Sequence, residues 1–253
     1  MKLKILFAGL MVGLSMTANA GLLHSYDYMG DAVDAVTNKA GVINGAVLTE
    51  DRFGNENGAY LFDGESYIDS VIDFSNVKTV EVWAKLGQQT DSGDMLFSLG
   101  DSTREGSGTN LWLNEGYDET GAAFNAWDSA TNIFYGDAIN SLVRDGKFHH
   151  FVLTNDEITG DASLYIDSVL VGVADYRHIT DDFFRVGAGR KDLKYAWDGV
   201  IDEVNLYSDL RDGTQIDKMF NVNAVSVSEP STFGVLGLSA IGLVALRRRK
   251  SKR

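Results

Sequence analysis

Histidine is the residue type in this sequence best suited to acid–base chemistry or metal binding near neutral pH. The chain has four histidines, and two of them, His149 and His150, are adjacent. Both lie in an apolar run that predicts a β-strand, and neighbouring residues of a strand point to opposite faces of a sheet. They cannot act together on one ligand, so we predict structural roles for both, with hydrogen bonds to nearby backbone groups.

Carboxylates offer a second kind of chemistry, because hydrolysis of a glycosidic bond uses two of them facing each other across the bond. Asp202 and Glu203 are adjacent in a predicted strand, so their side chains should diverge. Asp63 and Glu65 have alternate spacing, but Gly64 between them indicates a turn. The sequence therefore offers no pair of acids on one strand face, and we predict no catalytic residues and no enzymatic activity.

The amino-acid composition excludes cysteine-based chemistry and disfavours nucleic acid as a partner. There is no cysteine, which excludes a cysteine nucleophile and cysteine-ligated zinc. Residues 1–20 hold two of the 22 basic residues, and residues 229–253 hold six basic residues and one of the 36 acids. Residues 21–228 thus carry 14 basic and 35 acidic residues, a net charge of −21. Such a surface repels nucleic acid, so we predict no nucleic-acid partner.

Residues 1–20 have the pattern of a cleaved secretory signal peptide. Lys2 and Lys4 precede an apolar run at 5–14, and Ala18-Asn19-Ala20 provides the small-residue cleavage pattern. The apolar run is shorter than the roughly 20 residues that span a bilayer, which disfavours a retained anchor. We predict that the protein is exported.

Residues 229–253 have the layout of a sorting signal. Glu229-Pro230 is followed by an apolar segment at 233–246 and a basic end at 247–253. A short apolar segment with a basic end is held with that end in the cytoplasm. Residues 221–228 are predicted to link this tail to the domain.

The tail resembles the PEP-CTERM signal that exosortase-type transpeptidases of Gram-negative bacteria recognise, with Ser228 in place of the first proline. The resemblance implies transient anchoring in the inner membrane, processing near Glu229-Pro230, and delivery to the cell surface, the outer envelope or an extracellular matrix. The alternative is a plain C-terminal membrane anchor that is retained.

The sequence between the two ends is typical of short β-strands. Phe148 to Leu153 is largely apolar on both faces, which indicates a strand that is covered on both sides. A polar, glycine-containing break separates it from a second β-rich run, Ser163 to Val173, and together they predict an antiparallel hairpin. Lys78 to Leu86 alternates as a further strand, and Asp212 to Phe220 is predicted to form a single short helix.

The hairpin sequence, DGKFHHFVLTNDEITGDASLYIDSVLVGV at 145–173, resembles the laminin G-like branch of the concanavalin A-like lectin/glucanase superfamily. The segment WDGVIDEVNLY at 197–207 is similar to the closing strand of that family. Two residues depart from it, since Phe148 replaces a usual tryptophan and Ser168 replaces the glycine of a tight turn. The resemblance implies an all-β fold, an antiparallel two-sheet jelly-roll sandwich over residues 21–220, with its first and last strands as neighbours.

The resemblance also implies candidate sites. Many relatives hold one structural calcium ion through a carboxylate of the N-terminal loop and the aspartate of the closing strand, here Asp34 and Asp202. The alternative is that Asp34 is a turn residue and Asp202 a solvated strand residue. Laminarinase-type hydrolases of the superfamily place acids at E-x-D-x-x-E, a motif that this sequence lacks. Lectin-like members hold sugars with loop aromatics, and the candidates are Trp112, Tyr117, Trp127, Tyr135 and Tyr195. The alternative, which the sequence favours for most of them, is that these rings lie in the core.

These observations predict an exported, non-catalytic binding protein of the cell surface or of an exopolysaccharide or biofilm matrix. Its ligand is predicted to be extracellular polysaccharide, other carbohydrate or a surface protein. The alternatives are a glycan-active hydrolase or lyase of the same superfamily, and a purely structural matrix protein.

Overall fold

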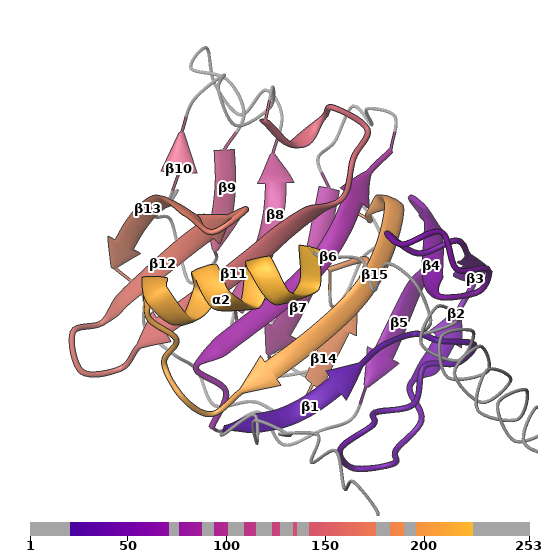
Figure 1. Cartoon of the computed structure of the whole chain (residues 1–253), viewed down its shortest axis with the longest axis horizontal. Coiled ribbons are helices and arrows are strands. Elements are labelled where there is room, and N and C mark those ends of the chain that lie inside the picture. The colour runs from indigo at the N-terminus through magenta and orange to yellow at the C-terminus, as the bar shows by residue number, and fades with distance from the viewer. Residues whose placement is uncertain are drawn as a thin grey trace, which may run out of the picture.

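Two antiparallel β-sheets lie face to face in the computed structural model, and a helix crosses the outer side of one of them (Figure 1). The structure describes residues 21–70, 76–87, 94–100, 109–114, 123–126, 134–135, 142–175, 183–189 and 196–224. The predicted signal peptide and sorting tail lie outside these residues. In the part of the chain that the structure describes, no helix is long and apolar enough to cross a membrane.

Among the described residues, the first sheet, called sheet I here, has eight strands. Their order is β13 (Val169–Asp175), β12 (Asp161–Ile166), β11 (His149–Asp156), β6 (Thr79–Leu86), β15 (Asp198–Tyr207), β4 (Ala59–Asp63) and β3 (Val47–Thr49), with β1 (Leu22–Tyr26) also paired to β15. Sheet II has seven strands in the part of the chain that the structure describes. Their order is β10 (Phe134–Tyr135), β9 (Ala123–Ala126), β8 (Thr109–Asn114), β7 (Asp94–Gly100), β14 (Phe183–Val186), β5 (Tyr67–Ser70) and β2 (Val42–Asn44).

Strand β15 joins the two ends of the domain. One of its edges pairs with β6, and the other edge is shared between β4 and the first strand, β1. The predicted two-sheet sandwich, with its first and last strands as neighbours, is therefore confirmed. A shift of register between Ile201 and Glu203 marks a β-bulge in β15.

The predicted hairpin forms, but its second run is two strands. Strand β11 is buried along nearly its whole length and pairs with β12, as expected. The chain then turns at Asp167 and Ser168, which have φ angles of 50° and 65°, and returns as β13. Two consecutive residues at positive φ are typical of the type I′ turn that suits a hairpin. The turn that the resemblance places at Ser168 therefore divides the β-rich run into these two strands, and Ser168 adopts the left-handed conformation of the glycine that it replaces.

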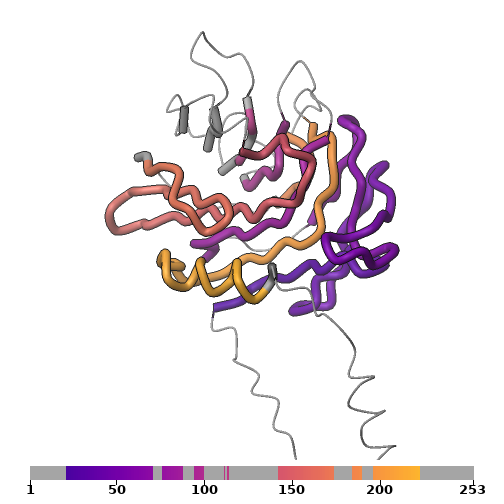
Figure 2. The backbone as a smooth tube through the Cα atoms, turned by 45° about the horizontal axis from the view of Figure 1, so that its top comes forward, coloured from indigo at the N-terminus to yellow at the C-terminus, as the bar shows by residue number. Residues whose placement is uncertain are grey.

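Helix α2 (Gly213–Ala224) crosses the outer face of sheet I (Figures 1 and 2). Asp212 and Gln215 form a reciprocal cap, in which each side chain accepts a hydrogen bond from the backbone N–H of the other, at 2.8 and 2.9 Å. Ile216 is fully buried against the sheet. The predicted helix is confirmed, and it continues four residues past Phe220 into the segment predicted as a linker.

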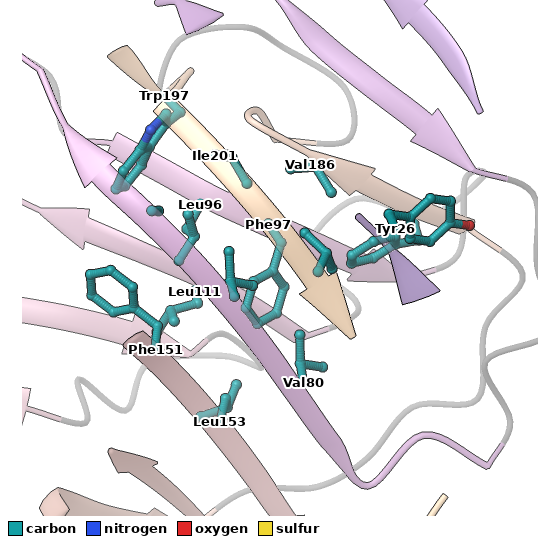
Figure 3. Packing of buried hydrophobic residues seen from close by; sticks show 14 of the residues in the cluster. Tyr26, Val80, Leu96, Phe97, Leu111, Phe151, Leu153, Val186, Trp197 and Ile201 are labelled. Carbon is teal, nitrogen blue, oxygen red and sulfur yellow. The ribbon is translucent and has the colours of Figure 1, made fainter. Parts of the chain in front are cut away.

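The space between the sheets is filled by side chains from both (Figure 3). Since alternate residues of a strand face one side, Val80 and Val82 of β6 meet Phe97 of β7 and Val186 of β14 in one cluster. Trp197, Tyr26 and Phe151 are among the largest fully buried side chains. With no cysteine in the sequence, this apolar core supplies the cohesion that disulfides give many exported domains.

Candidate functional site

Three polar and aromatic residues meet on the outer face of sheet II. Ile68 of β5 and Phe184 of β14 are buried in the core, so the residues that alternate with them point outward. Tyr67 and Asp69 project from β5 in this way, and Arg185 projects from β14, where it is the Cα partner of Asp69. We call these three residues the platform. Helix α2 lies on the other sheet and does not cover them (Figure 1).

The platform is held together by a charged pair and a stacked ring. Arg185 Nε donates to Asp69 Oδ1 at 2.6 Å, and Arg185 Nη2 donates to Asp69 Oδ2 at 2.9 Å. The guanidinium carbon lies 3.9 Å from the centre of the Tyr67 ring, while Nη1 donates to the Gly189 carbonyl at 2.8 Å. A two-fold arginine–carboxylate contact fixes both side chains, and the aromatic face adds cation–π attraction.

The neighbouring edge strand extends this surface. Val42 of β2 is the Cα partner of Asp69, and Asn44 is the partner of Tyr67, so each pair shares one face of the sheet. Val42 is 60% exposed, and the Asp69 side chain is 23% exposed. An exposed aliphatic residue thus lies beside an accessible carboxylate, a combination that suits ligands with both apolar and hydrogen-bonding parts.

The chemistry of the platform is that of binding. Its only carboxylate is already paired with an arginine, so it lacks the second acid that glycosidic hydrolysis uses. Each Asp69 oxygen accepts one hydrogen bond from Arg185, and a carboxylate oxygen has a further lone pair to accept another. Asp69 can therefore accept hydrogen bonds from a ligand without losing its internal partner.

A different polar cluster lies on the outer face of sheet I, beneath α2. Glu81 and His150 are both fully buried and meet at 2.8 Å between Oε1 and Nε2. The other Glu81 oxygen accepts hydrogen bonds from the Tyr207 hydroxyl at 2.7 Å and the Asn205 amide at 3.0 Å. Burial alone would raise the pKa of Glu81, but the contacts with His150, Tyr207 and Asn205 lower it below its ordinary value. Burial and the Glu81 charge raise the pKa of Tyr207. We call these four residues the Glu81 network.

Aromatic rings and an arginine close over this network. Phe220 of α2 stacks on Trp83, with ring centres 5.8 Å apart, and Trp83 packs against His150 at 4.8 Å. The Arg52 guanidinium lies over Trp83 at 4.7 Å. It also bridges Asp202 and Glu203, with nitrogen–oxygen distances of 2.5 and 2.6 Å.

The prediction that Asp202 and Glu203 point to opposite faces was wrong. The β-bulge in β15 adds a residue between the core positions Ile201 and Val204, so both acids reach the same arginine. Burial raises the pKa of Asp202 to about 6, although Arg52 opposes the shift. The pair serves to hold Arg52 in place over Trp83.

The two adjacent histidines diverge as predicted, but their ring nitrogens contact carboxylates instead of the predicted backbone groups. His150 points to Glu81, while His149 contacts Asp167 through Nδ1 at 2.7 Å and Asp145 through Nε2 at 3.0 Å. Burial alone would lower the pKa of His149, but the hydrogen bonds to the two aspartates raise it above its ordinary value. His149 thereby ties the start of β11 to the turn between β12 and β13.

Comparison with known proteins agrees with this architecture. The family model described as the concanavalin A-like lectin/glucanases superfamily matches residues 54–217. The chain belongs to this superfamily. The PEP-CTERM protein-sorting motif matches residues 226–250, which marks the protein as exported and sorted to the cell surface. No curated protein matches the chain.

Solved structures of the superfamily fold share low sequence identity with this chain. Domain 4 of AbnA, a GH43 extracellular arabinanase from Geobacillus stearothermophilus solved with arabinotriose, is 22% identical, with 79% of this chain and 98% of that chain covered and a TM-score of 0.54. The binding domain of botulinum neurotoxin serotype D/C is 10% identical, with coverages of 80% and 52% and a TM-score of 0.60. A structure of botulinum neurotoxin type C, whose cell entry depends on two ganglioside molecules, is 15% identical, with coverages of 80% and 51% and a TM-score of 0.59. The chain spans about half of each toxin chain, and the likeness shows the fold alone.

The calcium ligands that the superfamily resemblance predicts are held by protein partners. Asp34 Oδ2 contacts His24 at 2.7 Å and Thr37 at 2.5 Å, and Oδ1 accepts from the backbone N–H groups of Ser25 and Val36. Burial alone would raise the pKa of Asp34, but these hydrogen bonds lower it.

Asp202 likewise faces the Arg52 guanidinium, a cation that competes with any metal ion. The described residues contain no group of three or more histidines and acids arranged to hold a metal. A calcium ion held by Asp34 and Asp202 would have to compete with these protein partners, and the ion stays a prediction.

The Asp63-Gly64-Glu65 segment forms the predicted turn. Gly64 has a φ of 81°, and the Glu65 N–H donates to Asp63 Oδ1 at 3.1 Å. Asp63 is, however, the Cα partner of Asp198 across β4 and β15. Burial, followed by the Asp63 charge, raises the pKa of Asp198, while hydrogen bonds lower the pKa of Asp63. The two acids are far apart in the sequence, so only strand register brings them together.

Two of the predicted sugar-binding aromatics lie in strands that the structure describes. Trp112 lies in β8 and Tyr135 in β10. Tyr117, Trp127, Tyr195 and the remaining histidine, His178, lie outside the described residues. Tyr67 was absent from the candidates. Its alternation with the buried Ile68 was visible in the sequence, but Arg185 is its neighbour only through the pairing of β5 with β14.

Proposed function

We propose that the protein is a carbohydrate-binding module of the cell surface or of an extracellular biofilm matrix, and that the platform is its binding surface. The observation that carries the proposal is the contact of Tyr67, Asp69 and Arg185 on a sheet face away from α2. Such a surface combines an aromatic ring, a fixed carboxylate and an exposed aliphatic neighbour, which are the usual components of sugar sites. The solved arabinanase domain with arabinotriose supports a carbohydrate ligand.

The sorting motif supports the location and one partner. We propose that an exosortase-type transpeptidase processes the chain near Glu229-Pro230 after transient anchoring in the inner membrane of a Gram-negative bacterium. Mass spectrometry of the protein released from the cell surface tests this step. A C-terminus that still carries residues 247–253 would contradict it.

The binding proposal is tested by comparing two arginines of similar setting. Arg185 and Arg52 both stack on an aromatic ring and bind carboxylate, and their side chains are 10% and 8% exposed. We expect Arg185→Lys to weaken binding to a responsive polysaccharide about tenfold or more, because lysine cannot make the two-fold contact that positions Asp69. Arg52→Lys, on the opposite sheet, should leave affinity unchanged.

The measurement is affinity electrophoresis and calorimetry of residues 21–228 with a panel of polysaccharides that includes the host matrix. Saturable binding that Arg185→Lys alone weakens supports the proposal. Equal losses in both variants would show a general folding effect, and binding that neither variant changes would place the site elsewhere.

One observation favours a second candidate, a glycan-active enzyme. Asp63 and Asp198 are paired across two strands with pKa values shifted in opposite directions, a pattern typical of acid and base roles. If they act on a glycan, incubation should shorten the polysaccharide, and Asp198→Asn should stop the shortening. Unchanged chain length with the wild-type protein would exclude this candidate for the glycans tested.

A further inference from the structure

The platform also indicates which class of glycan it takes, an inference that rests on the proposed function. We infer that the ligand is a neutral, hydroxyl-rich glycan, and that glycans carrying carboxylate or sulfate groups are disfavoured. Three observations on the described residues lead to this conclusion, namely the hydrogen-bonding capacity of Asp69, the setting of Arg185 and the position of Val42.

Asp69 presents acceptors to the ligand. Its side chain is 23% exposed, and an ionised carboxylate offers only acceptors. Sugar hydroxyls can donate to its remaining lone pairs, whereas ionised carboxylate and sulfate groups have no proton to donate. An acidic sugar placed here would also meet like-charge repulsion from Asp69.

Arg185 does not act as an anion-binding site, because its charge is already compensated. Two of its nitrogens bind the two oxygens of Asp69, a third binds the Gly189 carbonyl, and the guanidinium carbon lies over the Tyr67 ring. Its side chain is only 10% exposed. Anion recognition by arginine requires the planar fork to face the ligand, and here the fork faces Asp69.

Val42 supplies the apolar part of the surface. It is 60% exposed and lies beside Asp69 across the β2–β5 pair, with Asn44 beside Tyr67. A pyranose or furanose ring has C–H groups that can cover an aliphatic side chain while its hydroxyls reach an adjacent carboxylate. The glycan is therefore expected to lie across β5 and β2, toward the edge of sheet II.

The net charge of the whole domain also disfavours acidic glycans. Residues 21–228 have a net charge of −21, so an acidic polymer is repelled before it reaches any single site. This repulsion weakens with added salt, whereas hydrogen bonding to a neutral glycan is nearly insensitive to salt. The two ligand classes thus differ in a measurable way.

The test is calorimetry of the mature protein with two neutral glycans, linear arabinan and a β-glucan, and two acidic ones, polygalacturonate and alginate, at low and high salt. We expect binding to at least one neutral glycan, with an affinity that salt changes less than about threefold. Asp69→Asn and Val42→Ala should each weaken it, the first by about tenfold and the second by several fold.

Matched variants keep the test specific. Glu56→Gln removes one negative charge from an exposed loop residue, and Val47→Ala truncates a valine that is 56% exposed on the short edge strand β3 of sheet I. Neither should change affinity. Tighter binding of an acidic glycan, lost at high salt, would overturn the inferred class and leave the proposed function standing. Binding of none of the four glycans, or of the host matrix, would overturn both.

Discussion

The outer faces of the two sheets both carry an arginine that stacks on an aromatic ring and binds carboxylate, but the two clusters differ in how exposed their surroundings are. On sheet I, Arg52 stacks on Trp83 and binds two acids, and below it Glu81 and His150 are fully buried beneath α2. On sheet II, Arg185 stacks on Tyr67 and binds Asp69, which remains part-exposed beside the exposed Val42.

The difference shows that residue type alone does not identify a binding site. Buried charges that satisfy one another contribute to the unique packing of α2 on its sheet, whereas an accessible acceptor next to an apolar residue can meet a ligand. We therefore expect changes on sheet I to alter stability and changes on the sheet II platform to alter affinity.

The largest effect on stability is expected for Glu81→Ala. The change leaves His150, Tyr207 and Asn205 buried without their acceptor, and breaking a buried pair costs about 3–5 kcal/mol. Urea denaturation of the mature protein measures this loss, with Glu56→Ala as an exposed control expected within about 0.5 kcal/mol of wild type. Variants of equal stability would show that the Glu81 network does not stabilise the fold.

The next largest effect is expected where α2 meets the sheet. Phe220→Ala removes the ring that stacks on Trp83, and for a half-buried phenylalanine we expect a loss of about 2 kcal/mol. Val222→Ala is the control, because Val222 lies on the same helix and is 74% exposed. At a temperature where both variants are folded, their glycan affinity should equal that of wild type. A loss of affinity in Phe220→Ala alone would show that the outer face of sheet I influences binding on sheet II.

A smaller effect is expected from pH through His149. Its pKa is raised in the folded state by Asp167 and Asp145, so its contribution is fully present below the unfolded value of about 6.5 and is lost as pH rises through the folded value. The stability of the wild type should therefore fall relative to His149→Gln as pH rises through this range. Curves of unfolding free energy against pH that stay parallel would show that the His149 contacts carry no such linkage.

The smallest effect is expected from calcium. A bound ion would raise the melting temperature, EDTA would reverse the rise, and Asp202→Ala would abolish it. The Asp34 carboxylate already accepts hydrogen bonds from protein donors, and Arg52 already pairs with Asp202. We therefore expect calcium to raise the melting temperature of the wild type only slightly. A large shift that Asp202→Ala removes would show that Arg52 gives way to the ion.

Much of the fold was predictable because its signals are local. The segment 145–173 carries its own turn residues and alternation, and the closing strand has a specific motif, so the pairing of β11 with β12 and of β15 with β1 followed. The reciprocal cap of α2 was likewise encoded within four residues, from Asp212 to Gln215.

The sites were less predictable because they depend on register between distant strands. A bulge of one residue in β15 lets Asp202 and Glu203 both reach Arg52. The residue pattern of the strand does not predict this bulge. The platform joins β5 to β14, which are separated by more than half of the sandwich sequence. Aromatic residues in predicted loops can be found in the sequence, whereas the contact of Arg185 with Asp69 depends on the pairing of β5 with β14.

NMR observation of the protein during titration with a neutral glycan tests binding at the platform most directly. The Nε–H of Arg185 is hydrogen-bonded to Asp69 and should give a resolved arginine signal. Binding at the platform should shift this signal and the Tyr67 ring resonances and leave the resonances of His150 and Tyr207 unchanged. Saturable binding that shifts residues of sheet I and leaves Arg185 and Tyr67 unmoved would contradict it.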